Sequence, residues 1–376
     1  MCGTGVTMAR DGVLAEWLRW VVLILTGSLD RDGGMRFNRG AINRLRPPRD
    51  RVASVPMLAG APSRPELPRL LGQLPAVALA GEIEAGRIRA LVLTGGNPIT
   101  AFPEPDRMRT ALQTLDALVV IDVMESELCE LATHVLPATG QLERADLTLA
   151  EATAVRSGLQ ATGAVVAPVA DRRSVWWMLG ALSQRMGIDA LGGAEPDSLT
   201  DELFLRGVLA HATIDADDVF AAGPRGVDIE IEYGWVRSTM LRGGRWNLAP
   251  GALLDRLAVH VDPGPDLVVT PRREIAWSNS VVYAGAGNEP TARVSPADAA
   301  RAGLATGHTA VVASAHGSLR AQVAVDPNLR EGVVSITHGR RDDGPGQLTS
   351  TQVDVDPIST MPLASGVPVT ITAVTR

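Results

Sequence analysis

The sequence is short of the residue types that bind metal clusters or nucleic acids. It has two cysteines, Cys2 and Cys129, among 376 residues, whereas an iron–sulfur cluster or a structural zinc ion normally takes four ligands, mostly thiolates. Aromatic residues make up only 3% of the chain, which leaves little for stacking on bases. The net charge is -7, without a block of lysine or arginine, so a phosphate backbone would meet no concentrated positive charge. We expect no iron–sulfur cluster, no metal ligand and no nucleic-acid partner.

A long apolar run is also lacking. Residues 20–25 are apolar, but a bilayer-spanning helix needs about 20 such residues, and Glu16 and Arg19 interrupt the upstream extension. Asp11, ahead of the run, does not suit a signal peptide. We expect a buried helix over residues 14–25 that ends before Gly27, in a cytoplasmic protein with free thiols and no membrane span.

The middle of the chain alternates between strand and helix patterns. Residues 90–93 and 117–121 are short apolar runs, and between them Met108, Ala111, Leu112 and Leu115 have helical spacing. A helix over 125–131 and a strand over 134–136 continue the series. This alternation predicts an α/β fold with a parallel sheet.

Two further patterns complete the expected architecture. Apolar residues at helical spacing predict a helix within 172–186 with its stripe in the core. From about residue 262 short alternating strands follow, among them 309–315 and 319–325, with one helix that begins at Ser295 and ends at Gly303. We expect two domains, an α/β domain over residues 1–261 and a mainly β domain over 262–376.

One loop stands where parallel sheets bind ligands, beyond the carboxyl end of a strand. Gly95, Gly96, Asn97 and Pro98 follow the run at 90–93, and glycines let a backbone approach a phosphate closely. Asp122 ends the next strand, 26 residues after Gly96, where an acidic residue can accept hydrogen bonds from a nucleotide. Each feature also has an ordinary interpretation, because Gly-Gly-Asn-Pro is a common tight turn and Asp122 could cap the next helix.

Several motifs together resemble one family. Leu-Val-Leu-Thr-Gly-Gly-Asn-Pro at 91–98, Val-Val-Ile-Asp at 119–122, Thr-His-Val-Leu-Pro-Ala at 133–138 and Glu143 occur in the order seen in the dimethyl sulfoxide reductase family of molybdopterin oxidoreductases, which includes formate dehydrogenases and nitrate reductases. The resemblance covers nearly the whole chain but only the back part of the family. It also includes segments 2–5, 25–27, 175–179, 270–273, 278–280, 295–300, Gly317 and 337–339.

The resemblance implies a site for molybdopterin guanine dinucleotide, which carries molybdenum or tungsten in the complete enzyme. A Rossmann-like domain would hold one dinucleotide, and a six-stranded, barrel-like domain would cover it. Arginines can neutralise a pyrophosphate and an asparagine can bond a pterin edge, although a solvated loop is the ordinary interpretation of the two arginines. The implied binding residues are Gly95, Gly96, Asn97, Pro98 and Asp122 in the first domain, and Arg272, Arg273, Asn279, His338 and Gly339 in the second.

The sequence also departs from the family pattern. It has Thr133-His134 where the family usually has Ala-Asp, and residues 143–147 replace a Glu-x-x-Gly-Thr run. The family's cluster cysteines and metal-binding Cys, selenocysteine or Ser lie in an amino-terminal half that this sequence does not contain. We therefore assign no catalytic residue and no metal ligand.

Three functions remain open. The first is the cofactor-binding carboxy-terminal portion of a molybdenum or tungsten bis-pterin oxidoreductase, inactive without an amino-terminal half, which would be its partner together with any redox subunit. A small substrate such as formate or nitrate would then be used only by the complete enzyme. The second is a non-catalytic binding module that docks with a separate catalytic chain through an apolar face around Trp17, Trp20 and Leu23. The third, a nicotinamide dehydrogenase, lacks the full Gly-x-Gly-x-x-Gly fingerprint.

Overall fold

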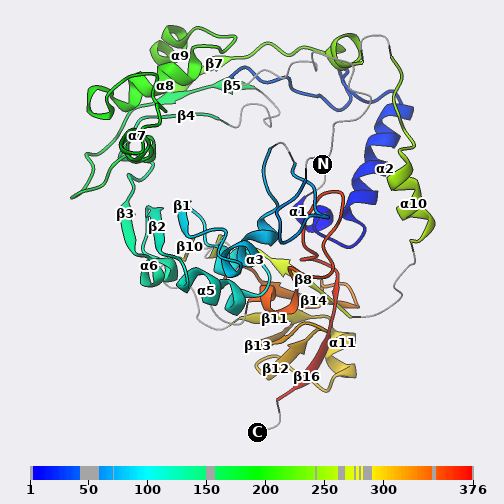
Figure 1. The fold of residues 1–376 in the computed structure, drawn as a ribbon. Coiled ribbons are helices and arrows are strands. Elements are labelled where there is room, and N and C mark those ends of the chain that lie inside the picture. The colour runs from blue at the N-terminus through cyan, green and yellow to red at the C-terminus, as the bar shows by residue number, and fades with distance from the viewer. Residues whose placement is uncertain are drawn as a thin grey trace.

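A computed structural model describes most of the chain. The description covers residues 3–42, 59–70, 72–149, 157–241, 244–260, 267–274, 277–278, 281–282, 290–340 and 344–374. In the view of Figure 1 a small parallel sheet lies near the middle, a curled sheet lies below it, and a group of helices lies above.

The parallel sheet consists of β1 (Ala90–Thr94), β2 (Ala117–Asp122) and β3 (His134–Pro137) in that order. The 3₁₀ turn η1 (Ala76–Ala78) and α3 (Leu79–Glu84) precede it, α4 (Pro98–Ala101) and α5 (Pro105–Gln113) connect β1 to β2, and α6 (Glu127–Leu131) connects β2 to β3. Its core contains the fully buried side chains of Met108, Leu112, Leu118, Val120 and Leu128. The predicted α/β fold is confirmed.

The second sheet has seven strands in the described residues, one more than the six that the resemblance implied. They are β8 (Val268–Arg272), β11 (Thr291–Val294), β12 (Thr309–Ala313), β13 (Ser318–Val325), β14 (Val333–Thr337), β15 (Val367–Pro368) and β16 (Thr370–Ala373), in the order β15-β8-β14-β11-β13-β12-β16.

This order explains why the second sheet curls. β15 and β16 are almost continuous in sequence but pair with opposite edges of the sheet, β8 and β12. Neighbouring residues are only about 3.8 Å apart, so the two edges must come close, which gives a barrel-like shape. As predicted, α11 (Pro296–Arg301) interrupts the strands, and the Ser295 side chain caps it by accepting a hydrogen bond from the Asp298 amide at 3.1 Å.

Short elements form a third group. They are β4 (Asp146–Leu147) with β6 (Ala161–Thr162), β5 (Gly158–Leu159) with β7 (Val227–Asp228), α7 (Val175–Arg185), α8 (Asp201–Leu209), α9 (Ala216–Ala222), the turns η3 (Pro196–Ser198) and η4 (Gly223–Arg225), and the pair β9 (Trp277–Ser278) and β10 (Val281–Val282). The prediction that the apolar stripe of α7 lies in the core is wrong. Leu179, Leu182 and Met186 are exposed, and Met178 is buried instead.

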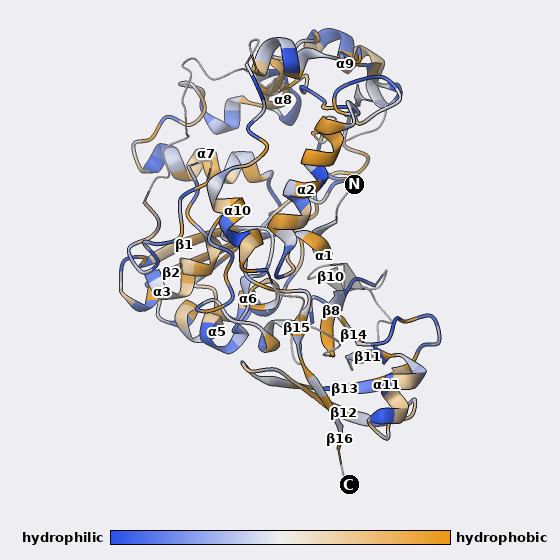
Figure 2. Cartoon of the chain, turned by 90° about the vertical axis from the view of Figure 1, so that its right-hand side faces the viewer, coloured by the Kyte–Doolittle hydropathy of each residue, from blue (hydrophilic) through white to orange (hydrophobic). Residues whose placement is uncertain are grey.

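The first long helix also differs from the expectation. α2 (Gly12–Leu25) follows α1 (Thr4–Thr7) and contacts α10 (Gly251–Ala258), but it is only partly buried, with Leu14 as its one fully buried side chain. Leu18, Val22 and Leu25, spaced along one face, are 42%, 57% and 71% exposed. Figure 2 shows how much of this helix is hydrophobic. No neighbouring element in the described part of the chain covers that face, which sequence spacing could not reveal.

The predicted domain boundary near residue 261 lies outside the described residues and stays a prediction. α10 belongs to the first part of the chain and β8 to the curled sheet. The beginning of the chain nevertheless packs against the end, since Ala9 forms a bridge with Ser365. None of the helices that the structure describes has the length and apolarity to cross a membrane.

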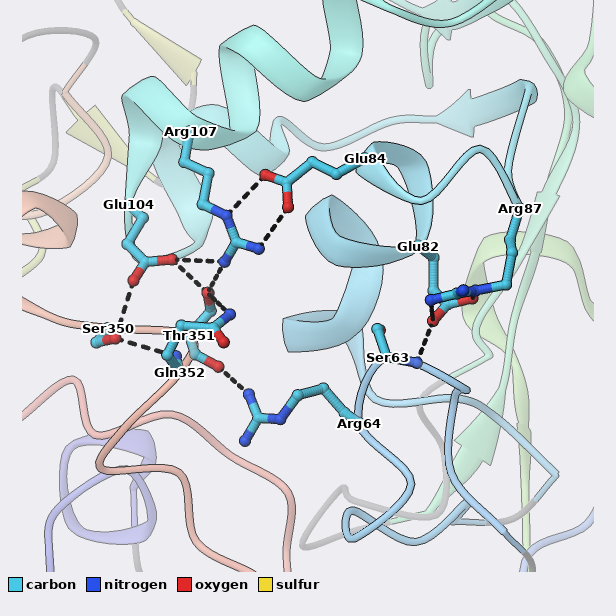
Figure 3. A network of polar contacts seen from close by, with 10 residues as sticks. All are labelled: Ser63, Arg64, Glu82, Glu84, Arg87, Glu104, Arg107, Ser350, Thr351 and Gln352. Carbon is cyan, nitrogen blue, oxygen red and sulfur yellow. Dashed lines mark hydrogen bonds and ion pairs between the residues drawn. The ribbon is translucent and has the colours of Figure 1, made fainter.

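A polar network joins the two sheets (Figure 3). Arg107 on α5 donates two hydrogen bonds to Glu84 at 2.7 and 2.8 Å and one to Thr351, in the segment between β14 and β15 of the curled sheet, at 3.0 Å. Beside it, hydrogen bonds from Arg87 are the largest cause that lowers the pKa of Glu82 to about 2. The remaining elements are a π-helix (Val236–Met240) and η6 (Pro345–Leu348).

We predict that shortening a buried side chain of the interior strand β14 destabilises the protein. Ile336 is fully buried among the side chains of the curled sheet, so Ile336→Ala should lower the free energy of unfolding by about 2–5 kcal/mol, through lost burial and the cavity left behind. Chemical denaturation measures the change. Leu203→Ala, at a half-exposed position on α8, serves as control and should change stability by less than ~0.5 kcal/mol. Equal effects of the two substitutions would contradict the assigned core.

Candidate functional site

The loop after β1 has a backbone that suits glycine. Gly95 and Gly96 have φ values of 66° and 80°, a left-handed region that residues with a side chain seldom adopt. No other atom lies within 4 Å of the position that a Cβ would occupy on either glycine. The loop therefore presents open, exposed backbone at the carboxyl end of the strand.

Asn97 fixes this loop rather than presenting its side chain to solvent. Its Oδ1 accepts a hydrogen bond from the Ile99 amide at 3.0 Å, which caps α4, and its Nδ2 donates to Glu127 Oε1 at 2.9 Å. Asn97 is buried, and Pro98 is the first residue of the helix. Both predicted residues thus determine the shape of the loop.

Asp122 lies next to the loop, as expected from neighbouring parallel strands. The Gly95 amide donates to the carbonyl of Ile121 at 2.9 Å. The Asp122 carboxylate accepts a hydrogen bond from the Val123 amide at 2.6 Å, while α6 has Ser126 as its N-cap residue. Asp122 therefore does not cap α6, and capping of the next helix, its ordinary interpretation, does not apply.

Two pockets adjoin at α4, since Ala101 and Phe102 line both of them. One, of about 390 Å³, includes all four loop residues from Gly95 to Pro98. The other, of about 190 Å³, is bordered by Arg273 and His338 at the ends of strands of the curled sheet. The structure thereby brings predicted residues of both halves of the chain to two pockets that share residues of one short helix and its C-cap.

Arg272 and Arg273 point to different surroundings. The Arg272 guanidinium donates to the Ser335 carbonyl at 2.8 Å and to Glu274 at 2.6 Å, and it does not line either pocket. Arg273 is exposed and lines the smaller pocket. Only the second arginine is placed to meet a ligand there.

The other predicted residues of this half lie near that end of the sheet. The His338 amide donates to the Arg272 carbonyl at 2.7 Å, and Gly339 follows with a φ of 83°. Asn279 lies outside the described residues.

The electrostatic state of His338 follows from its surroundings. Burial lowers the pKa of its imidazole below the ordinary value of 6.5, and the positive charge of Arg273 lowers it further. The pocket therefore holds a cation beside a neutral ring at neutral pH. Arg273 can donate charge-assisted hydrogen bonds to a phosphate, while the ring can donate or accept a single bond.

Sequence reasoning missed several residues of the smaller pocket. They carry no chemistry that a motif would reveal, and they come from distant parts of the chain. Among them are Thr4, Gly5, Thr100, Phe102, Pro103, Pro345, Gly346 and Thr349.

Among the described residues, no three His, Cys, Asp or Glu side chains are grouped so that they could hold a metal ion. Cys129 is a free, half-buried thiol beside the core of the parallel sheet. The arrangement as a whole can bind an anionic, partly apolar ligand, with the open glycine backbone in one pocket and a guanidinium in the pocket that adjoins it.

We predict that His338 makes folding stability depend on pH. Because its folded-state pKa is lowered, the unfolded chain binds more protons than the folded chain below about pH 6.5. Stability should therefore fall as pH decreases through this region, and His338→Gln should weaken that fall. Urea denaturation at pH 7.5 and 5.5 gives the comparison. His134→Gln, at an exposed strand position, is the matched control. A pH dependence unchanged by His338→Gln would contradict the assigned environment.

Comparisons with known proteins show which family the chain resembles. A family model described as molybdopterin oxidoreductase matches residues 2–185, and one described as molydopterin dinucleotide binding domain matches residues 275–368. The first match contains the glycine loop and Asp122, and the second contains His338. The larger pocket is lined by residues of the first matched region, and the smaller pocket by residues of both.

Individual relatives match larger or smaller parts of the chain. The F420-dependent formate dehydrogenase subunit alpha of Methanocaldococcus jannaschii is 25% identical over 297 residues, which are 72% of this chain and 42% of the relative. The nitrate reductase of Klebsiella oxytoca is 24% identical over 288 residues, 70% of this chain and 32% of that protein. The NADPH-Fe(3+) oxidoreductase subunit alpha of Geobacter sulfurreducens is 34% identical over 104 residues, 28% of this chain and 12% of the relative.

A solved structure shows the same fold. Acetylene hydratase from Pelobacter acetylenicus superposes with a TM-score of 0.64 at 16% identity, over 80% of this chain and 46% of that one. The chain spans less than half the length of each of these relatives. From the two family models and these relatives, the chain belongs to the molybdopterin oxidoreductases of the dimethyl sulfoxide reductase family, whose cofactor is a molybdopterin guanine dinucleotide.

Proposed function

We propose that this chain binds the dinucleotide of the cofactor across α4. The observation that carries the proposal is that two pockets adjoin there, one at the glycine loop and one at Arg273 and His338. A dinucleotide is long, and it carries phosphates between two ring systems, so a site with polar groups at separate places suits it. Gly95, Gly96, Asn97, Pro98 and Asp122 would shape one side.

The residues present fit such a group. The exposed backbone at Gly95 and Gly96 can approach a phosphate closely because no side chain intervenes, and the Gly96 amide can donate to it, since the Gly95 amide already bonds to the Ile121 carbonyl. Arg273 can neutralise a phosphate charge, and Gly339 lets the chain pass close to a ring. We keep Asn279 as a proposed member of this half of the site, whereas Arg272, which bonds to Ser335 and Glu274, would hold the end of the strand beside Arg273. When bound, the cofactor supplies the molybdenum or tungsten centre at which oxidation and reduction occur.

We further propose that these residues do not complete a catalytic centre by themselves. The sequence has only two cysteines, and the described residues group no metal ligands. The first relatives are named as alpha subunits, one of a formate dehydrogenase, so a partner polypeptide and a redox subunit would supply the remaining chemistry in the cytoplasm. Formate and nitrate are named for relatives and would represent the substrate class of the complete enzyme.

A second candidate, a module that docks with a separate catalytic chain, is favoured by one observation. Leu18, Val22 and Leu25 form an exposed apolar stripe along α2, and such stripes often mark protein contacts. Trp17 and Trp20, which we expected on that face, are half-buried. Trp17 donates to the Leu248 carbonyl at 3.0 Å and Trp20 packs against Phe37.

We predict that the chain purified from a host that makes the cofactor contains pterin but little molybdenum. Fluorescence of the oxidised pterin and guanosine monophosphate released by acid should approach one per chain. Gly96→Ala should reduce this occupancy, because the ligand must restore a left-handed conformation that costs about 1–2 kcal/mol, or roughly 5- to 30-fold in affinity.

The control for this experiment is Gly207→Ala, which lies in α8 at an ordinary backbone conformation with open space around it. It should leave the occupancy unchanged. Stoichiometric molybdenum in the lone chain would contradict the proposal that the centre is incomplete. Absence of pterin even with a co-expressed amino-terminal half would contradict cofactor binding.

For the docking candidate we predict that Val22→Glu weakens association with a co-expressed amino-terminal half of the family by at least about tenfold. A charge in the centre of the apolar stripe would have to be desolvated on docking. Leu203→Glu adds the same charge at an exposed position of α8 and should have no effect. Co-purification followed by titration calorimetry compares the affinities of the two variants. Equal binding by Val22→Glu and Leu203→Glu would exclude α2 as the contact.

A further inference from the structure

The walls of the smaller pocket come from segments that no sheet connects. Thr100, Ala101, Phe102 and Pro103 lie in and after α4, whereas Pro345, Gly346 and Thr349 lie in the segment 344–352. One backbone hydrogen bond joins the two walls directly, from the Glu104 amide to the Gly346 carbonyl at 3.1 Å. The shape of the pocket therefore depends on contacts around Glu104.

The approach of these walls is very close. A Cβ on Gly346 would lie 2.7 Å from the carbonyl oxygen of Phe102, nearer than real Cβ atoms come to other atoms. Only a glycine allows the segment to pack at this distance. The packing is thus specific, and a small displacement would change the pocket.

Glu104 adopts an unusual backbone conformation at this contact. Its φ and ψ are 58° and 57°, the left-handed region, which is unfavourable for a residue with a side chain. Such a conformation persists where the surroundings over-determine it, and it is frequent at ligand clamps. At Glu104 the surroundings that hold this backbone conformation include the hydrogen bonds of its side chain.

The carboxylate of Glu104 holds the segment 344–352 through its side chains (Figure 3). Its Oε1 accepts a hydrogen bond from Ser350 at 2.9 Å. Its Oε2 accepts from the Thr351 hydroxyl and from Arg107 at 3.1 Å. Ser350 and Thr351 are buried, so these bonds are shielded from water and a lost acceptor would leave buried hydroxyls unsatisfied.

The carboxylate is itself held from the parallel-sheet side. Arg107 is fixed by two hydrogen bonds to Glu84 on α3. Burial alone would raise the pKa of Glu104, but the hydrogen bonds from Thr351, Ser350 and Arg107 outweigh it and lower that pKa. The group is therefore ionised at neutral pH and bonded to both parts of the chain.

We propose that Glu104 is a positioning residue for the cofactor pocket. It fixes the segment 344–352 against the loop between α4 and α5, so that the wall of Pro345, Gly346 and Thr349 is in place before a dinucleotide enters. The proposal rests on the proposed function and adds a residue that no motif indicated. Without this anchor the ligand has to order the segment on binding, which weakens binding and speeds dissociation.

The test compares how fast pterin leaves the loaded chain. Wild type and variants are purified with bound cofactor, transferred to cofactor-free buffer, and the released pterin is measured by fluorescence after oxidation. Glu104→Ala should release pterin about tenfold faster, and its melting temperature should fall because the buried Ser350 and Thr351 hydroxyls lose their acceptor. Glu104→Gly, which relieves the backbone conformation but also removes the carboxylate, should release it equally fast. Glu202→Gln, which removes an exposed ion pair on α8, is the control and should have no effect.

A double-mutant cycle tests the direct contact. If Glu104 acts through Ser350, then Ser350→Ala should speed release in the wild type and add little in Glu104→Ala. If Glu104→Ala does not fold, the isosteric Glu104→Gln decides in its place. Release at the wild-type rate from the variant that folds would overturn the proposal while leaving cofactor binding intact. A wild-type chain without pterin would overturn both.

Discussion

The contact between the α4–α5 loop and the segment 344–352 is the constraint on which the candidate site depends. The parallel sheet and the curled sheet have separate apolar cores, so hydrophobic burial stabilises each without fixing their relative position. Polar groups do that instead, with Glu104 and Arg107 bonded to Thr351 across the boundary. Because one pocket includes residues of both parts, a shift between them would separate Arg273 from the wall formed by Phe102.

Features that depend on local chain geometry could be predicted from the sequence. The strands around 90–93 and 117–121 and the helix between them follow from apolar spacing, and the structure has them within a few residues. The cap at Ser295 was predictable because a Ser-Pro-x-Asp start satisfies free amides in a way that few other sequences do. The glycine loop could be predicted as a turn from its residues, whereas its role in binding a ligand was inferred only from the family resemblance.

Features that depend on which face meets a neighbour could not be predicted in the same way. Arg272 and Arg273 are adjacent in sequence, yet one bonds to Ser335 and Glu274 inside the sheet and the other reaches the pocket. Alternation along a strand makes one side chain point inward and the next outward. Only the pairing of β8 with its neighbours shows which of the two arginines points inward. Glu104 gave no signal because its role arises from residues about 250 positions later, at 346–351.

The net charge of -7 bears on how an anionic cofactor could be held at all. Long-range attraction would not favour a phosphate, and exposed charges are screened beyond about 10 Å in salt. Binding must therefore rely on short contacts: the exposed backbone of the glycine loop with the Gly96 amide, and the guanidinium of Arg273 beside a neutral His338. Short contacts form only if donors are already within hydrogen-bond distance of their acceptors. For this chain, affinity should thus depend less on total positive charge than on the fixed separation of the two pocket walls, which is the quantity that Glu104 controls in our proposal.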